Sequence, residues 1–94
     1  MTAYAVTRGK HATLAADTVD TITFATRHYV VDVVNIGAVD IYGTLDGSVP
    51  TVGGDDTFVV PAGKRREIDN LGQGVSVVSI IATDPTEYNV EARL

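Results

Sequence analysis

The residues that could bind a cation gather in one glycine-rich stretch of the sequence. Asp46, Asp55 and Asp56 carry their carboxylates within the segment DGSVPTVGGDD. Calcium takes about six to eight oxygen ligands, and such a loop could supply a few of them. The spacing fits no known cation-binding loop, so we interpret Asp46 as the start of a turn and the Asp55–Asp56 pair as a solvated loop tip. The pattern does not decide whether the loop binds a cation.

Other residue types that serve in catalysis are scattered along the chain. His11 and His28 are the two histidines, and neither belongs to a cluster with the ligand spacing of a zinc site. Cysteine is absent, and no serine lies in a G-x-S-x-G pattern. We therefore expect no enzyme activity, no metal centre and no cofactor.

One basic run stands out in an otherwise acidic chain. Lys64, Arg65 and Arg66 follow a predicted turn, and charged residues at such places usually belong to a solvated edge strand. The functional alternative is a contact with an acidic partner. Tyr42, which we place on the polar face of its strand, could instead stack against a sugar, although tyrosines belong more often to the core or its rim.

The N-terminal residues show no convincing period. Tyr4 and Val6 could anchor this segment on a neighbouring subunit, and Arg8 and Lys10 could add charge contacts there. Ordering a free arm costs about 1–2 kcal/mol per residue, so it should become ordered only where a partner supplies contacts. We therefore expect an arm over residues 1–11 and a single domain over residues 12–94, with a melting temperature nearly unaffected by deletion of residues 2–11.

Composition excludes several classes of protein. The chain has 94 residues and a net charge of −5, which fits one domain and disfavours binding to nucleic acid. No apolar run approaches the roughly 18–20 residues that a membrane span requires, and the N-terminus lacks the apolar centre of a signal peptide. We expect synthesis in a cytoplasm and no membrane partner.

The elements that position these residues are predicted to be short β-strands. Strict alternation of apolar and polar residues over Val39–Leu45 indicates a half-buried strand, and the Asp46–Gly47 pair favours a turn. A loop too long for a tight hairpin then leads to a second strand at Thr57–Pro61 and a turn at Ala62–Gly63. Further strands are predicted at Thr13–Ala15, Thr18–Ala25, Tyr29–Ile36, Lys64–Asp69, Val75–Ala82 and Glu87–Leu94.

About eight such strands, with turn signals every 8–12 residues, predict an all-β, antiparallel β-sandwich that is immunoglobulin-like or jelly-roll-like. A small closed barrel is the alternative. The residues that we expect in the core are Phe24, Val31, Val33, Ile41, Leu45, Phe58, Val60, Val77, Ile81 and Val90.

Two segments also resemble a known family of proteins. VDVVN at Val31–Asn35 and IYGTLDGSVPTVGGDDTFVVPA at Ile41–Ala62 resemble small proteins of tailed phages that infect actinobacteria. The central loop carries the likeness, through Asp46, Gly47, Pro50, Gly53, Gly54, Asp55 and Asp56. TVDTITF, GVSVVSIIA and YNVEAR extend the likeness over most of the chain beyond His11.

The resemblance implies a structural protein of the virion, most often a capsid decoration or minor capsid protein that binds the outside of the shell. Its expected partner is the major capsid protein, and it could form a homo-oligomer on the particle. The alternatives are a binding module for carbohydrate or another host surface, and a tail or head–tail accessory protein. The family's likeness carries over no catalytic residue, and Lys64–Arg66 and the basic N-terminal segment depart from its pattern.

Overall fold

The computed structural model describes residues 5–6, 9–55, 57–68 and 74–93. These residues form nine strands, which are β1 (Ala5–Val6), β2 (Gly9–Leu14), β3 (Asp20–His28), β4 (Val30–Asn35), β5 (Ile41–Thr44), β6 (Phe58–Val60), β7 (Arg65–Ile68), β8 (Val75–Ile81) and β9 (Thr86–Arg93). Valine, isoleucine and threonine dominate them, as expected for half-buried pleated strands. The described part of the chain contains no helix, so the predicted all-β class is confirmed.

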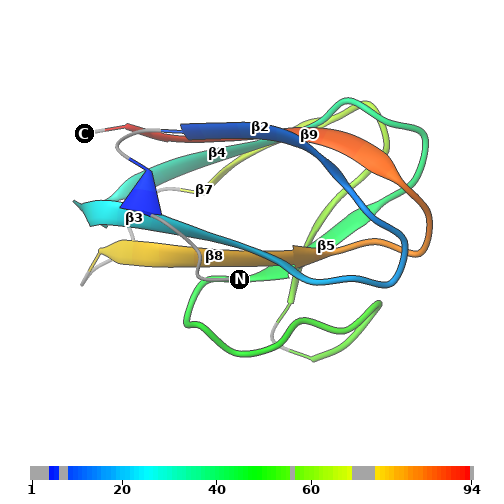
Figure 1. The fold of residues 1–94 in the computed structure, drawn as a ribbon, viewed down its shortest axis with the longest axis horizontal. Helices are drawn as coiled ribbons and strands as arrows, with labels where there is room; N and C mark the ends of the chain where they lie inside the picture. Colours follow the sequence, from blue (N-terminus) through cyan, green and yellow to red (C-terminus); the bar gives the residue numbers. More distant parts are fainter. Residues whose placement is uncertain (1–4, 7–8, 56, 69–73, 94) are drawn as a thin grey trace.

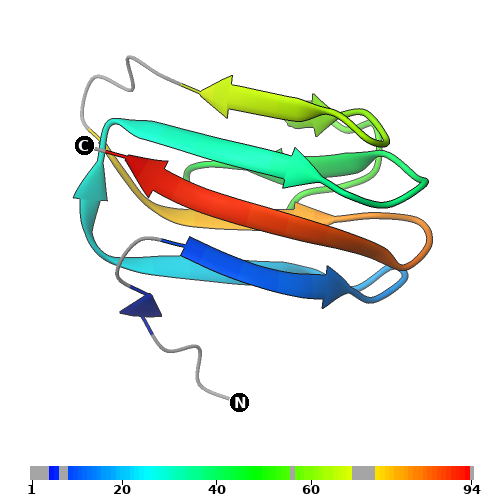
Figure 2. The same cartoon turned by 90° about the horizontal axis from the view of Figure 1, so that it is seen from above.

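Eight of the strands form two four-stranded antiparallel sheets that pack face to face (Figures 1 and 2). One sheet has the order β3-β8-β5-β6, and the two-residue β1 extends it by pairing in parallel with β3. The other sheet has the order β2-β9-β4-β7. The predicted antiparallel sandwich of about eight short strands is therefore confirmed.

The strand order distinguishes between the two predicted kinds of sandwich. From β2 to β9, consecutive strands lie in opposite sheets, except for β5 and β6, which are neighbours in one sheet. Two four-stranded sheets joined in this alternating way form a jelly roll. The loop between β5 and β6 thus belongs to the single hairpin among these eight strands.

The core lies between the sheets and consists of small aliphatic side chains with two aromatic ones. Its buried apolar members are Leu14, Ile22, Phe24, Val31, Val33, Ile41, Val60, Val78, Ile80, Ala82, Tyr88, Val90 and Ala92. Six of the ten predicted core residues are among them. Leu45 and Phe58 are partly buried and pack against this cluster, so those two predictions hold in part.

The predicted inward face of β8 was wrong. Val78 and Ile80 are fully buried in the core, whereas Val77 and Ile81 are only partly buried. Both faces of this strand are apolar, so alternation could not show which one points inward. Tyr29, the first residue of the predicted strand Tyr29–Ile36, is exposed because it lies at a bend between β3 and β4.

Two predicted boundaries differ from the structure. Arg27 and His28, expected to end a strand, continue β3 and keep it paired with β8 as far as His28 and Val75. Residues 9–11, assigned to the N-terminal arm, form the first half of β2, which pairs with β9 from Gly9–Glu91 onward. The sandwich therefore begins earlier in the chain than residue 12.

Candidate partner-binding surface

Residues 46–55 and 57, in the loop that joins β5 to β6, are held in place by their own polar groups; we call this segment the valine loop. In its first half, Asp46 Oδ1 accepts hydrogen bonds from Ser48 Oγ at 2.6 Å and from Ser48 N at 3.0 Å. These bonds lower the pKa of Asp46. Thr44 Oγ1, at the end of β5, donates to the Ser48 carbonyl at 2.6 Å. Asp46 therefore begins a turn, as predicted from the sequence.

The second half of the loop contains a tight turn. Gly54 N donates to the Thr51 carbonyl at 3.0 Å, and Gly53 has a φ of 67°, in the left-handed region that favours glycine. Thr57 Oγ1 then donates to the Gly54 carbonyl at 2.5 Å. A Cβ on Gly54 would lie 1.9 Å from Thr51 Oγ1, so only glycine fits this turn unchanged. Local hydrogen bonds therefore fix the conformation of the loop.

The valine loop covers part of the outer face of the β3-β8-β5-β6 sheet, along which Figure 1 shows it running. Thr44 and Ser79 are register partners that face away from the core, yet they are only 4% and 3% exposed. Pro50 is fully buried. The loop is thus anchored to the sheet by a buried proline and by the Thr44 hydroxyl.

Two apolar side chains of this anchored loop point into solvent. Val49 is 75% exposed and Val52 is 44% exposed. The residue before a proline is restricted to extended backbone, and Val49 precedes the buried Pro50. The anchor therefore limits the conformations from which the Val49 side chain projects. Val59 on the edge strand β6 is a further exposed apolar residue.

An open hollow of about 420 Å³ lies where the loop meets β6 and β7. Its lining consists of Leu45, Asp46, Thr57, Phe58, Val59 and Arg66. Phe58 lies opposite Gly43 in the register, and a Cβ on Gly43 would lie 2.5 Å from the ring. The glycine thus makes room for the ring that forms one wall of the hollow.

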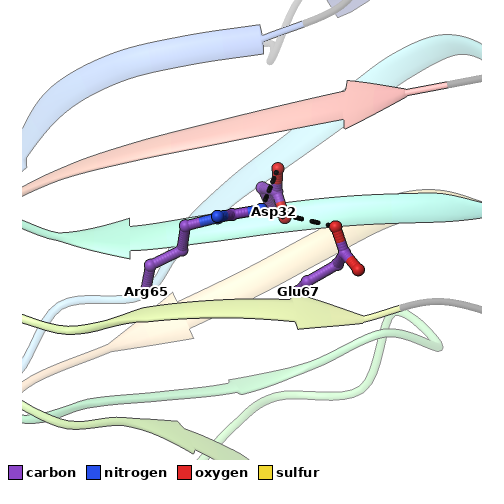
Figure 3. A network of polar contacts seen from close by, with 3 residues as sticks. All are labelled: Asp32, Arg65 and Glu67. Atoms are coloured by element: carbon purple, nitrogen blue, oxygen red, sulfur yellow. Dashed lines mark hydrogen bonds and ion pairs between the residues drawn. The ribbon is translucent and has the colours of Figure 1, made fainter.

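The outer face of the other sheet has a different character. Glu67, Asp32 and Glu91 are register neighbours across β7, β4 and β9. Like charges directly opposite each other destabilise a sheet. Arg65 compensates, because its Nη2 lies 3.3 Å from both carboxylate oxygens of Asp32 and 3.3 Å from Glu67 Oε2 (Figure 3). This face is therefore acidic and charged, whereas the opposite face carries the valine loop.

The predicted basic run separates into three different environments. Lys64 is exposed at a turn in which its N donates to the Pro61 carbonyl at 3.0 Å. Arg65 binds the acidic row on the outer face. Arg66 lies opposite the buried Val33, and its Nη1 donates to the Val59 carbonyl at 3.3 Å, which joins β7 to β6. The three cations do not form one patch.

Lys10 and Arg66 occupy equivalent positions on the two edge strands of the β2-β9-β4-β7 sheet. Lys10 on β2 lies opposite Val90, and Arg66 on β7 lies opposite Val33; both valines belong to the core. An inward-directed charge on an edge strand opposes pairing with another chain. These two candidate contact residues thus have a structural reason to be basic.

The remaining predicted contact residues are only partly described. Tyr4, Arg8 and Asp56 lie outside the described residues. The backbone of Val6 pairs in parallel with Phe24. Asp55, like Asp46, is exposed on the valine loop. Val49, Val52 and Val59 were not predicted as contact residues, although the Val49–Pro50 dipeptide inside a polar loop was a signal for the first of them.

The two histidines lie on strands of different sheets, His11 on β2 and His28 on β3. His11 Nε2 is paired with Glu87 on the neighbouring strand β9, and both side chains are about half exposed. Within the described residues, no cluster of three or more histidine or acidic side chains could hold a metal ion. The same residues contain no helix able to span a membrane.

Comparisons of the chain with protein-family models, with curated proteins and with solved structures found no match.

Proposed function

We propose that this protein is a structural component of a phage virion, a capsid decoration protein that binds the outside of the shell. One line of support comes from the sequence and the other from the structure. The sequence of the central loop and its flanking strands resembles such proteins. The structure gives that loop a fixed conformation with Val49 and Val52 exposed. The exposed valines on an anchored loop are the observation that carries the proposal.

The difference between the two outer faces supports attachment by one side. The β3-β8-β5-β6 sheet carries the valine loop, with Val59 at its edge. The β2-β9-β4-β7 sheet presents the exposed Glu67 and Glu91, with Asp32, which is only 7% exposed, between them. Both outer faces carry exposed carboxylates, but the loop face adds the exposed Val49 and Val52, which gain from removal from water. The protein would therefore face the shell with the valine loop and the solvent with the acidic row.

Binding of this kind needs no chemical step. A protein that binds only the assembled shell stabilises it by mass action, in proportion to its concentration relative to its Kd. The major capsid protein is the proposed partner, and the virion is the proposed location. Jelly rolls occur in viral capsid and lectin domains, but a fold does not establish a function, so the argument depends on the loop and the faces.

Quantitative mass spectrometry of purified particles tests the proposal. A decoration protein should be present in hundreds of copies, about one for each capsid subunit or symmetry-related site. Absence from the particles would contradict the proposal. A handful of copies would favour a tail or head–tail accessory protein instead.

A glycan array tests the alternative that the protein binds carbohydrate. Tyr42 is half-buried between Val59 and Ile81 on the outer side of its sheet. If the protein is a host-surface binding module, it should bind glycans on an array, and a Tyr42→Ala variant should lose this binding.

A further inference from the structure

The charge of the valine loop indicates what kind of surface it fits. Between Leu45 and Thr57 the sequence holds three aspartates and no lysine or arginine. Asp46 and Asp55 are exposed within this segment, on the same loop as Val49 and Val52. The loop therefore presents apolar side chains among carboxylates, in a protein whose net charge is already −5.

We infer that the valine loop binds a protein surface with an apolar centre and a rim of lysine or arginine side chains. The inference rests on the proposed function and names the chemistry of the capsid surface that the loop would contact. Complementary charge at a rim steers the encounter and selects the partner, while the apolar centre supplies much of the affinity. A second copy of this acidic chain would place carboxylates against carboxylates and is disfavoured.

The fixed conformation of the loop should lower the entropy cost of binding a partner. A loop that must become ordered on binding loses about 0.5–1.5 kcal/mol for each immobilised flexible side chain. Here Ser48, Thr51 and Thr57 already take part in hydrogen bonds that hold the loop before any partner arrives. The hydrogen bonds from Ser48 also favour the ionised form of Asp46, so its charge persists into mildly acidic solution.

The test measures binding of the labelled full-length protein to phage particles prepared without it, at low and at high salt. A Val49→Ser, Val52→Ser double variant removes the apolar centre. A second double variant, Asp46→Asn with Asp55→Asn, removes two charges, while the asparagine at position 46 keeps an oxygen for Ser48. Ile36→Ser and Asp84→Asn are matched controls at exposed positions outside the loop. Thermal melts check that each variant is folded.

The valine variant should bind at least about tenfold more weakly, whereas Ile36→Ser should bind as the unmodified protein does. The asparagine variant should bind more weakly at low salt and should depend less on salt, whereas Asp84→Asn should not change the salt dependence. These two results together support the inference.

Other outcomes would contradict the inference and would show whether the loop contact, the basic partner surface or the proposed function is wrong. If the unmodified protein binds particles and the valine variant binds equally well, the proposed function stands and the loop is not the contact. If the asparagine variant binds as tightly at every salt concentration, the partner surface is not basic. Self-association that disappears in the valine variant, detected by sedimentation velocity, would assign the loop to a second copy. If the unmodified protein does not bind particles at all, the proposed function and this inference both fail.

Discussion

The hydroxyl of Thr86 donates a hydrogen bond to Asn35 Oδ1 at 2.8 Å, and both side chains are almost completely buried. The amide nitrogen of Asn35 donates to the carbonyls of Val39 at 2.6 Å and Val60 at 3.0 Å. One side chain at the end of β4 thus connects the start of β9, the segment before β5 and the end of β6. A Cβ on Gly37 would lie 1.8 Å from Thr86 Oγ1, so glycine there leaves room for this hydroxyl.

Replacing Asn35 should therefore destabilise the sandwich strongly. Asn35→Ala leaves several buried polar groups without a partner and should lower the free energy of unfolding by about 3–5 kcal/mol. Thr86→Val removes a single hydrogen bond with little change of volume and should lower it by about 1–2 kcal/mol. Urea unfolding measures both changes, and equal losses for the two variants would contradict a central role for Asn35.

Arg65 and Lys64 are adjacent in sequence but should differ in their effect on stability. Arg65→Met removes the guanidinium that pairs with the two carboxylates of Asp32 and Glu67, and should lower the free energy of unfolding by about 1–2 kcal/mol, between the values for exposed and buried ion pairs. Lys64→Met at the exposed turn should change it by less than about 0.5 kcal/mol. Chemical denaturation at neutral pH compares the two, and 1 M salt should reduce the difference. Similar losses would show that the pairing with Asp32 contributes little.

Tyr88 should make stability sensitive to alkaline pH. Burial disfavours its phenolate, and its hydroxyl donates to Asp20 Oδ2 at 2.7 Å; together these raise the pKa of Tyr88 well above its usual value. A raised pKa in the folded state means that the stabilisation is complete below the unfolded value of about 10 and is lost as the pH rises beyond it. Tyr88→Phe should be less stable than the unmodified protein by about 1–3 kcal/mol near neutral pH.

Urea unfolding from pH 8 to pH 11 provides the measurement. The difference between the unmodified protein and Tyr88→Phe should be constant up to about pH 10 and should narrow above it. A difference that stays constant to pH 11 would show that Tyr88 does not titrate as the structure indicates.

Deletion of residues 2–11 should now lower the melting temperature, contrary to the expectation from sequence. The deletion removes Gly9, Lys10 and His11, which are three of the six β2 residues paired with β9. A loss of about 1 kcal/mol or more corresponds to a drop of at least about 4 °C in a domain of this size. Circular dichroism melts of both chains measure it. An unchanged melting temperature would support the original interpretation of residues 1–11 as a separate arm.

The sequence predicted the fold where one face of a strand is polar. Tyr88, Val90 and Ala92 alternate with charged or amide residues in the predicted strand Glu87–Leu94. All three are buried, as predicted for Val90. The prediction failed at β8, where Val77, Val78, Ile80 and Ile81 make both faces apolar. Its outward side is also buried at Ser79, which lies opposite Thr44 and bonds to Thr21 Oγ1, a long-range environment that local alternation does not encode.

The candidate contact surface was less predictable than the fold. The glycines and aspartates of the loop predicted its turns, and Gly47 and Gly53 have positive φ values in the structure. Gly63, in the predicted turn after β6, has one as well. Which loop side chains face outward depends on what lies under the loop, and Pro50 is buried there while Val49 is exposed. Lys64, Arg65 and Arg66 were selected as candidate contact residues only because three positive charges are adjacent in the sequence. These residues separate because Arg65 and Arg66 lie on opposite faces of β7.

A reconstruction of the intact particle would show where the protein is attached and which side faces the shell. We expect density for the sandwich on the outer surface of the shell, with the valine loop against the capsid protein and Glu67 and Glu91 facing solvent. Density confined to the tail, or a sandwich on the shell with Val49 and Val52 facing solvent, would contradict this expectation.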